Sequence, residues 1–273
     1  MRRGHNGGRM KGVFARRELI RALVGREMRS RYKGSALGVL WSLLTPLFMA
    51  LIYTFFFRLL AGRAANTASI IVGVFAWQFT ANAVHQGMAC ISGNGNLVKK
   101  VAFPRVILPV AVTVAAGVDY MISLLVQFGL VGVLLWRAGE FFGPQIALLP
   151  LVFLAHAWFN FGLAMLLGSL NVYFRDTQHL VGVGLTALFF LSPGMYDLGF
   201  VERMAAEWHP RLMDIYLLNP LAGLFTAYRV AFLPGTVWPS SPMIWVGLAW
   251  PLLFTPLCGL LFRRLQRNFA DHV

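Results

Sequence analysis

The chain has 273 residues, of which 58% are hydrophobic and only 12% are charged, and its formal net charge is +14 at pH 7. A soluble globular domain carries about 25% charged residues, so this composition indicates a membrane protein. The first 33 residues hold 11 of the 24 Lys and Arg residues. The positive-inside rule explains this concentration better than nucleic-acid binding does, because no basic patch outside the apolar segments is interleaved with aromatics.

The N-terminal third begins with a basic segment and continues into an apolar one. Residues 1–15 are predicted to be a disordered cytoplasmic tail. In residues 16–33, apolar side chains recur one, three or four positions apart and arginines take the remaining surface, which predicts an amphipathic helix on the cytoplasmic face of the membrane. Ala36–Phe57 then has 22 residues without a charged side chain. At about 1.5 Å per residue it reaches roughly 33 Å, enough to cross a hydrocarbon core of about 30 Å.

Five further apolar segments are predicted to cross the membrane. They are Ser69 to Ile91, Val106 to Trp136, Ile146 to Tyr173, Leu180 to Tyr196 and Met243 to Phe262. With six spans, the segments on the inner side hold 18 Lys and Arg residues and those on the outer side hold six. This asymmetry predicts an all-α integral membrane protein of six transmembrane helices with both termini in the cytoplasm.

Two connecting segments stand out. Ser92–Asn96 is rich in Gly and Asn, which favour turns, and residues 94–105 after it carry three basic side chains, so this segment is predicted to be cytoplasmic. Residues 197–232 are too charged and too often broken by Pro to be a seventh span. Backbone can dip into a membrane only where other helices shield it. We predict two short re-entrant helices on the outer face; the alternative is a loosely packed surface loop.

Motifs for catalysis or metal binding are absent from the sequence. Lys33-Gly34-Ser35 has the wrong order for a phosphate-binding loop and lacks its first glycine. No His/Cys cluster has zinc spacing, and Cys90 and Cys258 are expected to be small core residues, not a disulfide. The chain is therefore not expected to hydrolyse ATP by itself.

Three titratable residues lie within apolar spans. Asp119 is the only acidic residue deep in a span, and an intramembrane carboxylate is costly enough to suggest a function. We favour a structural role for Asp119, in which its carboxylate is hydrogen-bonded to Tyr120 or to a neighbouring helix, or is hydrated near the outer interface. His85 and His156 have no acid at helical spacing, so they are expected to be packing residues and not proton relays.

Aromatic residues are numerous, and most are expected in membrane-interface belts or in the core. Some of them would suit a glycan conduit, because sugar rings stack their C–H faces on aromatic planes. The aromatic candidates for such a lining are Trp41, Tyr53, Phe56, Phe57, Phe189, Phe190 and Tyr196.

A run at the start of the first span resembles the signature of ABC-2-type permeases that export polysaccharides, namely O-antigen, capsule and teichoic acid. It reads Arg31-Tyr32-Lys33-Gly34-Ser35-Ala36-Leu37-Gly38-Val39-Leu40-Trp41-Ser42, followed by Pro46. Further matches follow in order: Asn96–Arg105, Asn171–Asp176, Ser192–Tyr196, Asn219-Pro220-Leu221 with Tyr228-Arg229, and Phe269-Ala270-Asp271. Each motif is loose alone, but together they cover the chain from Arg16 onward.

The resemblance implies a homodimer of this chain in the cytoplasmic (inner) membrane of a bacterium, surrounded by lipid, with two separate ATP-binding subunits below it. ATP and Mg would then be bound by those partners, and this chain would hold no cofactor and no metal. It also implies that the cargo is a polysaccharide, lipid-linked or free, that passes between the two copies. By resemblance, residues 16–33 and 94–105 contact the ATPase, and residues 197–232 form an outer gate.

The resemblance also suggests individual site residues. The implied ATPase-coupling residues are Arg16, Arg17, Arg29, Arg31, Tyr32, Asn96, Lys99, Lys100, Phe103, Pro104, Arg105, Arg175 and Asp176. For the gate and conduit lining it adds, to the seven aromatic residues above, Pro193, Asn219, Pro220 and Tyr228.

Rival functions make different demands on the sequence. An ABC-2 exporter of a small drug or lipid would share the six-span plan but favour an aliphatic lining. A membrane glycosyltransferase or scaffold would need clustered carboxylates at the membrane face, which the sequence lacks. A proton-coupled carrier would need more buried acids than Asp119.

Overall fold

A computed structural model describes residues 17–32, 34–35, 37–38, 40–61, 66–100, 103–174, 176–209 and 211–273. Across these ranges the regular structure is entirely helical, as predicted. The elements are α2 (Arg17–Tyr32), α3 (Leu40–Ala61), α4 (Thr67–Ser92), α5 (Gly95–Lys100), α6 (Ile107–Arg137), η1 (Pro144–Leu148), α7 (Leu149–Tyr173), α8 (Thr177–Phe190), α9 (Leu198–Trp208), α10 (Arg211–Leu217), α11 (Pro220–Phe232), α12 (Met243–Leu265), η2 (Gln266–Asn268) and α13 (Phe269–His272).

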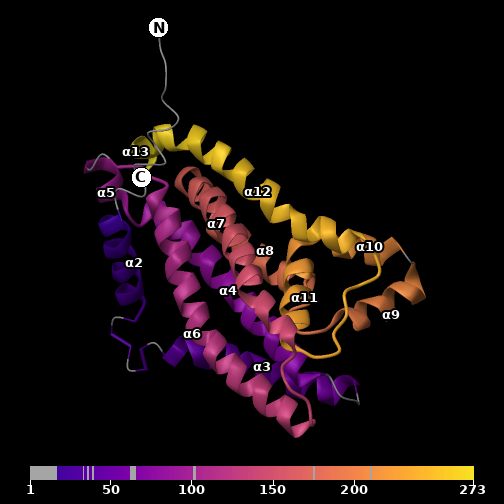
Figure 1. Cartoon of the computed structure of the whole chain (residues 1–273). Helices are drawn as coiled ribbons and strands as arrows, with labels where there is room; N and C mark the ends of the chain where they lie inside the picture. The colour runs from indigo at the N-terminus through magenta and orange to yellow at the C-terminus, as the bar shows by residue number, and fades with distance from the viewer. Residues whose placement is uncertain are drawn as a thin grey trace.

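Helix α4 lies at the centre of the bundle. It packs against α3, α6, α7 and α11, and α12 covers the far side of α7 (Figure 1). In its most apolar stretch of 18 residues, 78% of the residues are buried. Among the described helices of spanning length, α4 is the least hydrophobic, and its polar side chains, such as Gln78, Thr80 and Asn82, would be costly to expose to lipid, which explains why α4 occupies the core.

Membrane-spanning length is reached by fewer helices than predicted. Among the described residues, four helical stretches are long and apolar enough to span: α4, α6, η1 with α7, and residues 243–272. Helix α3 has 22 residues, several of whose side chains lie outside the described part of the chain, whereas α8 has only 14. At about 1.5 Å per residue, the 14 residues of α8 reach only about 21 Å. This helix was expected to continue to Tyr196, but it ends at Phe190, ahead of Pro193-Gly194, which disfavours helix.

The segment 197–232 forms three helices, α9, α10 and α11, instead of the two predicted. The axes of α10 and α11 meet at 86°, so this pair is either one broken span or a re-entrant turn. The break falls at Asn219-Pro220, as expected: Pro220 opens α11, and Asn219 caps it by accepting a hydrogen bond from the Leu221 amide. The additional break follows α9, where His209 is in an extended conformation.

The amphipathic helix predicted for residues 16–33 is present as α2, but its apolar stripe packs on protein. Leu23 is 7% exposed, and Leu19, Ile20 and Val24 pack around it in a cluster that includes Leu108 of α6. Helix α2 therefore runs beside α6 (Figure 1). The arginines of α2 whose side chains are described face away from this cluster: Arg17, Arg21, Arg26 and Arg29 are exposed.

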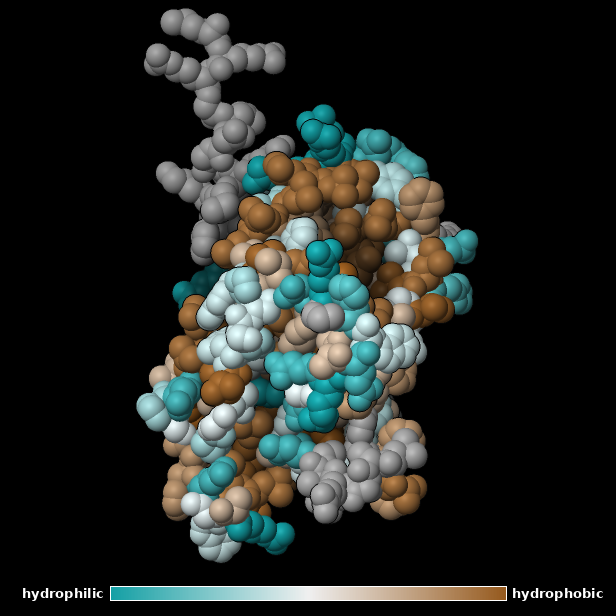
Figure 2. Space-filling model, turned by 90° about the vertical axis from the view of Figure 1, so that its right-hand side faces the viewer, coloured by the Kyte–Doolittle hydropathy of each residue, from teal (hydrophilic) through white to brown (hydrophobic). Residues whose placement is uncertain are grey.

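Large apolar side chains cover the outward faces of several helices. Leu51 of α3, Leu125 of α6, Leu180 of α8 and Leu253 of α12 are each more than 60% exposed. Exposed leucines in this number are costly in water, so these faces suit lipid or another protein. On the side that carries α9 and α10, polar side chains form a broad central area between apolar regions (Figure 2).

Candidate coupling surface and outer gate

The turn between α4 and α5 is fixed by its asparagine. The Asn94 side-chain amide donates to the Cys90 carbonyl at 2.8 Å, which satisfies a backbone group at the end of α4. Its side-chain oxygen accepts a hydrogen bond from the Arg26 guanidinium of α2. The first residue of the predicted coupling segment therefore joins α2 to α4.

Helix α5 turns one apolar side chain inward and its polar side chains outward. Val98 is 4% exposed, whereas Asn96, Lys99 and Lys100 are exposed. Three of the predicted coupling residues thus form a polar, basic surface at the end of the bundle where α5 and α13 meet (Figure 1). Such a surface has the chemistry to dock an acidic partner.

Arg105 lies differently from the two lysines. It is half-buried, its guanidinium donates to the Gln266 carbonyl, and it lies 6.0 Å from the centre of the Phe269 ring. These contacts are made within the chain, so the structure gives Arg105 a role in holding the C-terminal segment. Phe103 and Pro104, next to it, are also half-buried.

The remaining predicted coupling residues are spread over two other elements. Arg17 and Arg29 are exposed on α2, and Asp176 is exposed just before α8. Arg16 and Arg175 lie outside the described residues, as do the side chains of Arg31 and Tyr32.

A buried arginine organises the opposite end of the bundle. Arg229 of α11 is 3% exposed. Its Nε donates to Ser69 Oγ of α4 at 2.7 Å, and its Nη2 donates to the carbonyls of Pro193 and Tyr196, the latter at 2.9 Å. One side chain therefore joins α4, the turn after α8, and α11. The prediction did not select it, although an arginine within an apolar helix is a recognisable signal of a specific role.

The turn after α8 is also bound from α10 and α11. Asn219 donates from its side-chain amide to the Leu191 carbonyl at 3.0 Å and to Ser192 Oγ at 2.9 Å. The Tyr216 hydroxyl donates to the Tyr196 hydroxyl at 3.1 Å, which in turn donates to the Phe190 carbonyl at 2.7 Å. Burial raises the pKa of Tyr196, so this hydroxyl keeps its proton at neutral pH.

The other predicted conduit residues divide into exposed and buried groups. Trp41, Phe56 and Phe190 are between 49% and 57% exposed, whereas Phe189 is 7% exposed. The Phe189 ring lies 5.4 Å from Tyr53 and 5.2 Å from Trp77, and this aromatic group connects α3, α4 and α8. The Phe57 side chain lies outside the described part of the chain.

Tyr228 does not reach the surface of the chain. It is fully buried, and its ring lies 5.8 Å from both Tyr120 and His156. In this conformation its side chain packs in the interior of the chain, between α6, α7 and α11. Pro193, Asn219 and Pro220 lie at the turn after α8 and at the start of α11.

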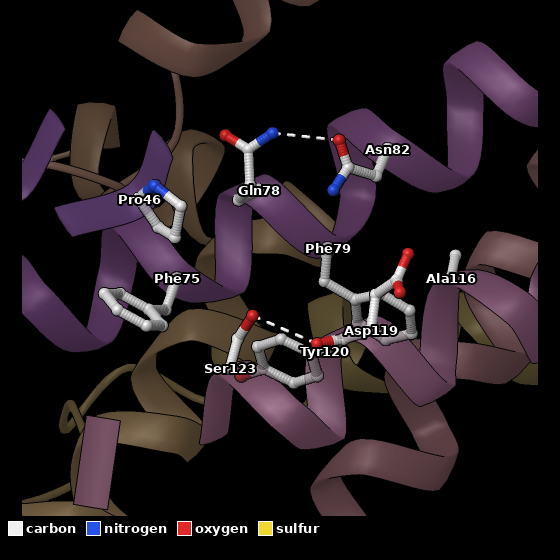
Figure 3. A pocket seen from close by; sticks show the side chains of 9 residues that line it. All are labelled: Pro46, Phe75, Gln78, Phe79, Asn82, Ala116, Asp119, Tyr120 and Ser123. Atoms are coloured by element: carbon white, nitrogen blue, oxygen red, sulfur yellow. Dashed lines mark hydrogen bonds between the residues drawn. The ribbon is translucent and has the colours of Figure 1, made fainter. Parts of the chain in front are cut away.

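The titratable residues within the spans have distinct surroundings. Asp119 is 2% exposed and lines a small pocket between α3, α4 and α6 with Gln78, Asn82 and Ser123 (Figure 3). His156 is fully buried and its Nε2 lies 2.6 Å from Thr80 Oγ1, the environment expected of a packing histidine. His85 is instead exposed.

Comparison with known proteins identifies the class. Residues 18–233 match the family model of the ABC-2 type transporter, and the chain belongs to this family. It is 31% identical over 266 residues to the O-antigen export system permease protein RfbA of Myxococcus xanthus, a match that covers 97% of this chain and 98% of that protein.

Two further relatives are similar over nearly the whole chain. RfbA of Klebsiella pneumoniae, also an O-antigen export system permease protein, is 27% identical, with 93% of this chain and 94% of that protein covered. The polysialic acid transport protein KpsM of Escherichia coli is 23% identical, with 94% and 96% covered.

Proposed function

We propose that this chain is the membrane-spanning subunit of an ATP-driven exporter that moves a polysaccharide such as O-antigen across the cytoplasmic membrane. The observation that carries the proposal is the similarity to O-antigen export permeases along the whole chain. The proposal assigns ATPase docking to the exposed basic helix α5 and the outer gate to the other end of the bundle, where Arg229 is bonded to Ser69. The cargo of this proposal is a lipid-linked polymer.

The proposed assembly contains two copies of this chain and two separate ATP-binding subunits, which bind ATP and Mg. Each copy crosses the membrane six times, with α3 and α8 as the first and fifth spans and both termini in the cytoplasm. The short length of α8 suits this proposal if the second copy covers part of it. The apolar faces of α3 and α8, with Leu51 and Leu180 exposed, support it.

In this proposal the ATPases dock on α2, α5 and the turn at Asp176, using exposed side chains such as Arg29, Asn96, Lys99 and Lys100. The proposed docking residues also include Arg16, Arg17, Arg31, Tyr32 and Arg175. Closure of the ATPase pair around ATP would push α5. The conduit would open between the two copies, where Trp41, Phe56 and Phe190 offer exposed aromatic faces for weak contact with sugar rings.

A deletion and complementation experiment tests the function. In a strain lacking this chain, we expect the polymer to accumulate inside the cell and to disappear from the surface. The intact chain should restore surface polymer, while a chain expressed with an ATPase whose phosphate-binding lysine is replaced should not. Normal surface polymer in the deletion strain, with loss of resistance to a small amphiphile, would support the drug or lipid exporter instead.

A further inference from the structure

The last eight residues of the sequence lie against the predicted coupling segment. Helix α13 contacts α5 and α7, and Figure 1 shows α5, α13 and the C-terminus together at one end of the bundle. One of these contacts is at Gly95, the first residue of α5. A Cβ atom placed on Gly95 would lie 2.5 Å from Cγ1 of Val273, so a larger residue at position 95 requires Val273 to move. The absence of a side chain permits this approach.

Phe269 holds this segment in place. Its side chain is fully buried, and its ring lies 5.6 Å from Phe262 of α12 and 6.1 Å from Tyr173 of α7. Arg105, just beyond α5, lies over the same ring and donates to the Gln266 carbonyl. A single aromatic side chain therefore lies among groups from α7, α12 and the coupling segment.

Tyr173 adds a second attachment. Its hydroxyl donates to the Leu265 carbonyl at 2.8 Å, and its ring lies 4.7 Å from that of His272. The last turn of α7 is thereby joined to the end of α12 and to α13. The hydrogen bond also satisfies one of the carbonyls that a helix leaves unpaired at its C-terminal end.

Helix α12 continues from this attachment to the outer gate. At its other end, a Cβ on Gly247 would lie 2.3 Å from the Leu217 carbonyl oxygen of α10, and a Cβ on Gly223 of α11 would lie 3.0 Å from Leu248 Cγ. At Gly247 there is no room for a side chain, and at Gly223 a side chain would require Leu248 to shift. Direct contacts therefore connect this end of α12 to α10 and α11.

We propose that Gln266–Val273 form a tail brace, which positions α5 and transmits its movement to α12. The role in transport rests on the proposed function, because it requires an ATPase acting on α5. Phe269 is its main positioning residue, and Arg105 belongs to the brace and not to the ATPase-docking surface. The brace remains attached to α5 throughout the transport cycle, so that the two move as one unit.

A disulfide tests the contact and its persistence. A Cβ on Gly95 would lie 3.8 Å from Val273 Cβ, close to the typical separation of about 3.8 Å in disulfides. Gly95→Cys and Val273→Cys are combined in a chain in which Cys90→Ala and Cys258→Ala remove the native thiols. We expect rapid cross-linking on mild oxidation and export within about twofold of the reduced protein; each single cysteine variant is the control. Failure to cross-link, or a block of export that a reductant relieves, would overturn the brace.

A second experiment separates positioning from docking. With Phe269→Ala in the full complex, we expect the ATPase to co-purify in normal amount and to hydrolyse ATP, while export falls at least fivefold. Phe269→Leu keeps most of the apolar volume and should restore much of the lost export. Asp271→Asn, on the exposed side of α13, should leave export unchanged. Unchanged export with Phe269→Ala, or loss of ATPase binding together with export, contradicts the inference. If the unaltered complex exports no polysaccharide, the proposed function fails, while cross-linking still reports on the contact.

Discussion

Arg229 joins three segments at the end of the bundle opposite α5 and α13. Its donors reach Ser69 Oγ, the Pro193 carbonyl and the Tyr196 carbonyl, so no smaller or shorter side chain can replace it. A guanidinium has five N–H donors in a fixed planar arrangement, whereas a lysine ammonium offers three at one point. The position therefore requires Arg specifically, not simply a positive charge.

We predict that Arg229→Lys lowers the stability of the purified protein by on the order of 2–3 kcal/mol, because at least one buried carbonyl loses its donor. The loss of stability is measured as a lower melting temperature of the protein in detergent. Arg203→Lys, at an exposed position of α9, is the matched control and should leave the melting temperature unchanged. Equal melting temperatures for the two variants would show that the buried bonds contribute little.

Arg229 also shows why the site was only partly predictable. Its partner Ser69 lies 160 residues away in sequence, and no local pattern connects the two. The resemblance implies a gate or conduit role for Tyr228, and no local pattern shows that its side chain is fully buried in the chain. In contrast, the exposed positions of Asn96, Lys99 and Lys100 follow from the amphipathic character of a short helix, which is visible in sequence.

At the scale of elements, the coupling segment contains two kinds of basic residue. Lys99 and Lys100 are exposed on α5, whereas Arg105 is bonded to the Gln266 carbonyl. We predict that Lys99→Glu with Lys100→Glu reduces ATPase co-purification several-fold without changing the melting temperature, since no buried contact is lost.

Arg105→Glu should behave in the opposite way. It places a carboxylate against a carbonyl oxygen and over an aromatic face, both of which repel negative charge, so we expect the melting temperature to fall. ATPase co-purification and the melting temperature are measured for Arg105→Glu and for the variant that combines Lys99→Glu with Lys100→Glu. A stable Arg105→Glu protein that fails to bind the ATPase would return Arg105 to the docking surface.

The close approach of α4 to the turn after α8 gives another test. A Cβ on Gly73 would lie 2.0 Å from the Gly194 carbonyl oxygen, so Gly73→Ala forces the turn away from α4. Overpacking of this kind typically costs about 1–3 kcal/mol. We expect a lower melting temperature and a leaky or blocked gate, measured by export. Gly184→Ala on α8, where nothing lies within 4 Å, is the control and should be neutral.

The helices themselves were largely predictable. The span expected at 106–136 is α6 at Ile107–Arg137, because an unbroken apolar run has well-defined ends. The segment 197–232 was harder: α9 and α10 are short, and helices of this length are specified by tertiary packing more than by their own sequence. The end of α8 at Phe190, by contrast, precedes a helix-breaking signal that is visible in the sequence, Pro193-Gly194, and the hydrogen bonds from Asn219 hold the turn beyond it.

At the scale of the whole molecule, the charge distribution predicts an orientation. The proposed topology places α5 in the cytoplasm and α9 on the outer side. We predict that Glu207→Cys on α9 reacts with an impermeant thiol reagent in intact spheroplasts, whereas Asn96→Cys on α5 reacts only after lysis. Both positions are exposed, and Cys90→Ala with Cys258→Ala removes the background. The reverse labelling pattern would show that the chain has the opposite orientation in the membrane.

Unequal packing of the helices has a mechanical consequence. Helix α4 is enclosed by α3, α6, α7 and α11, while α8 buries only Thr177, Leu185 and Phe189. Repacking α4 would disturb every one of its neighbours at once, whereas α8 can tilt or rotate at the cost of few contacts. We therefore expect α4, α6 and α7 to act as a rigid frame in any working cycle. The mobile wall of the pathway would be α8.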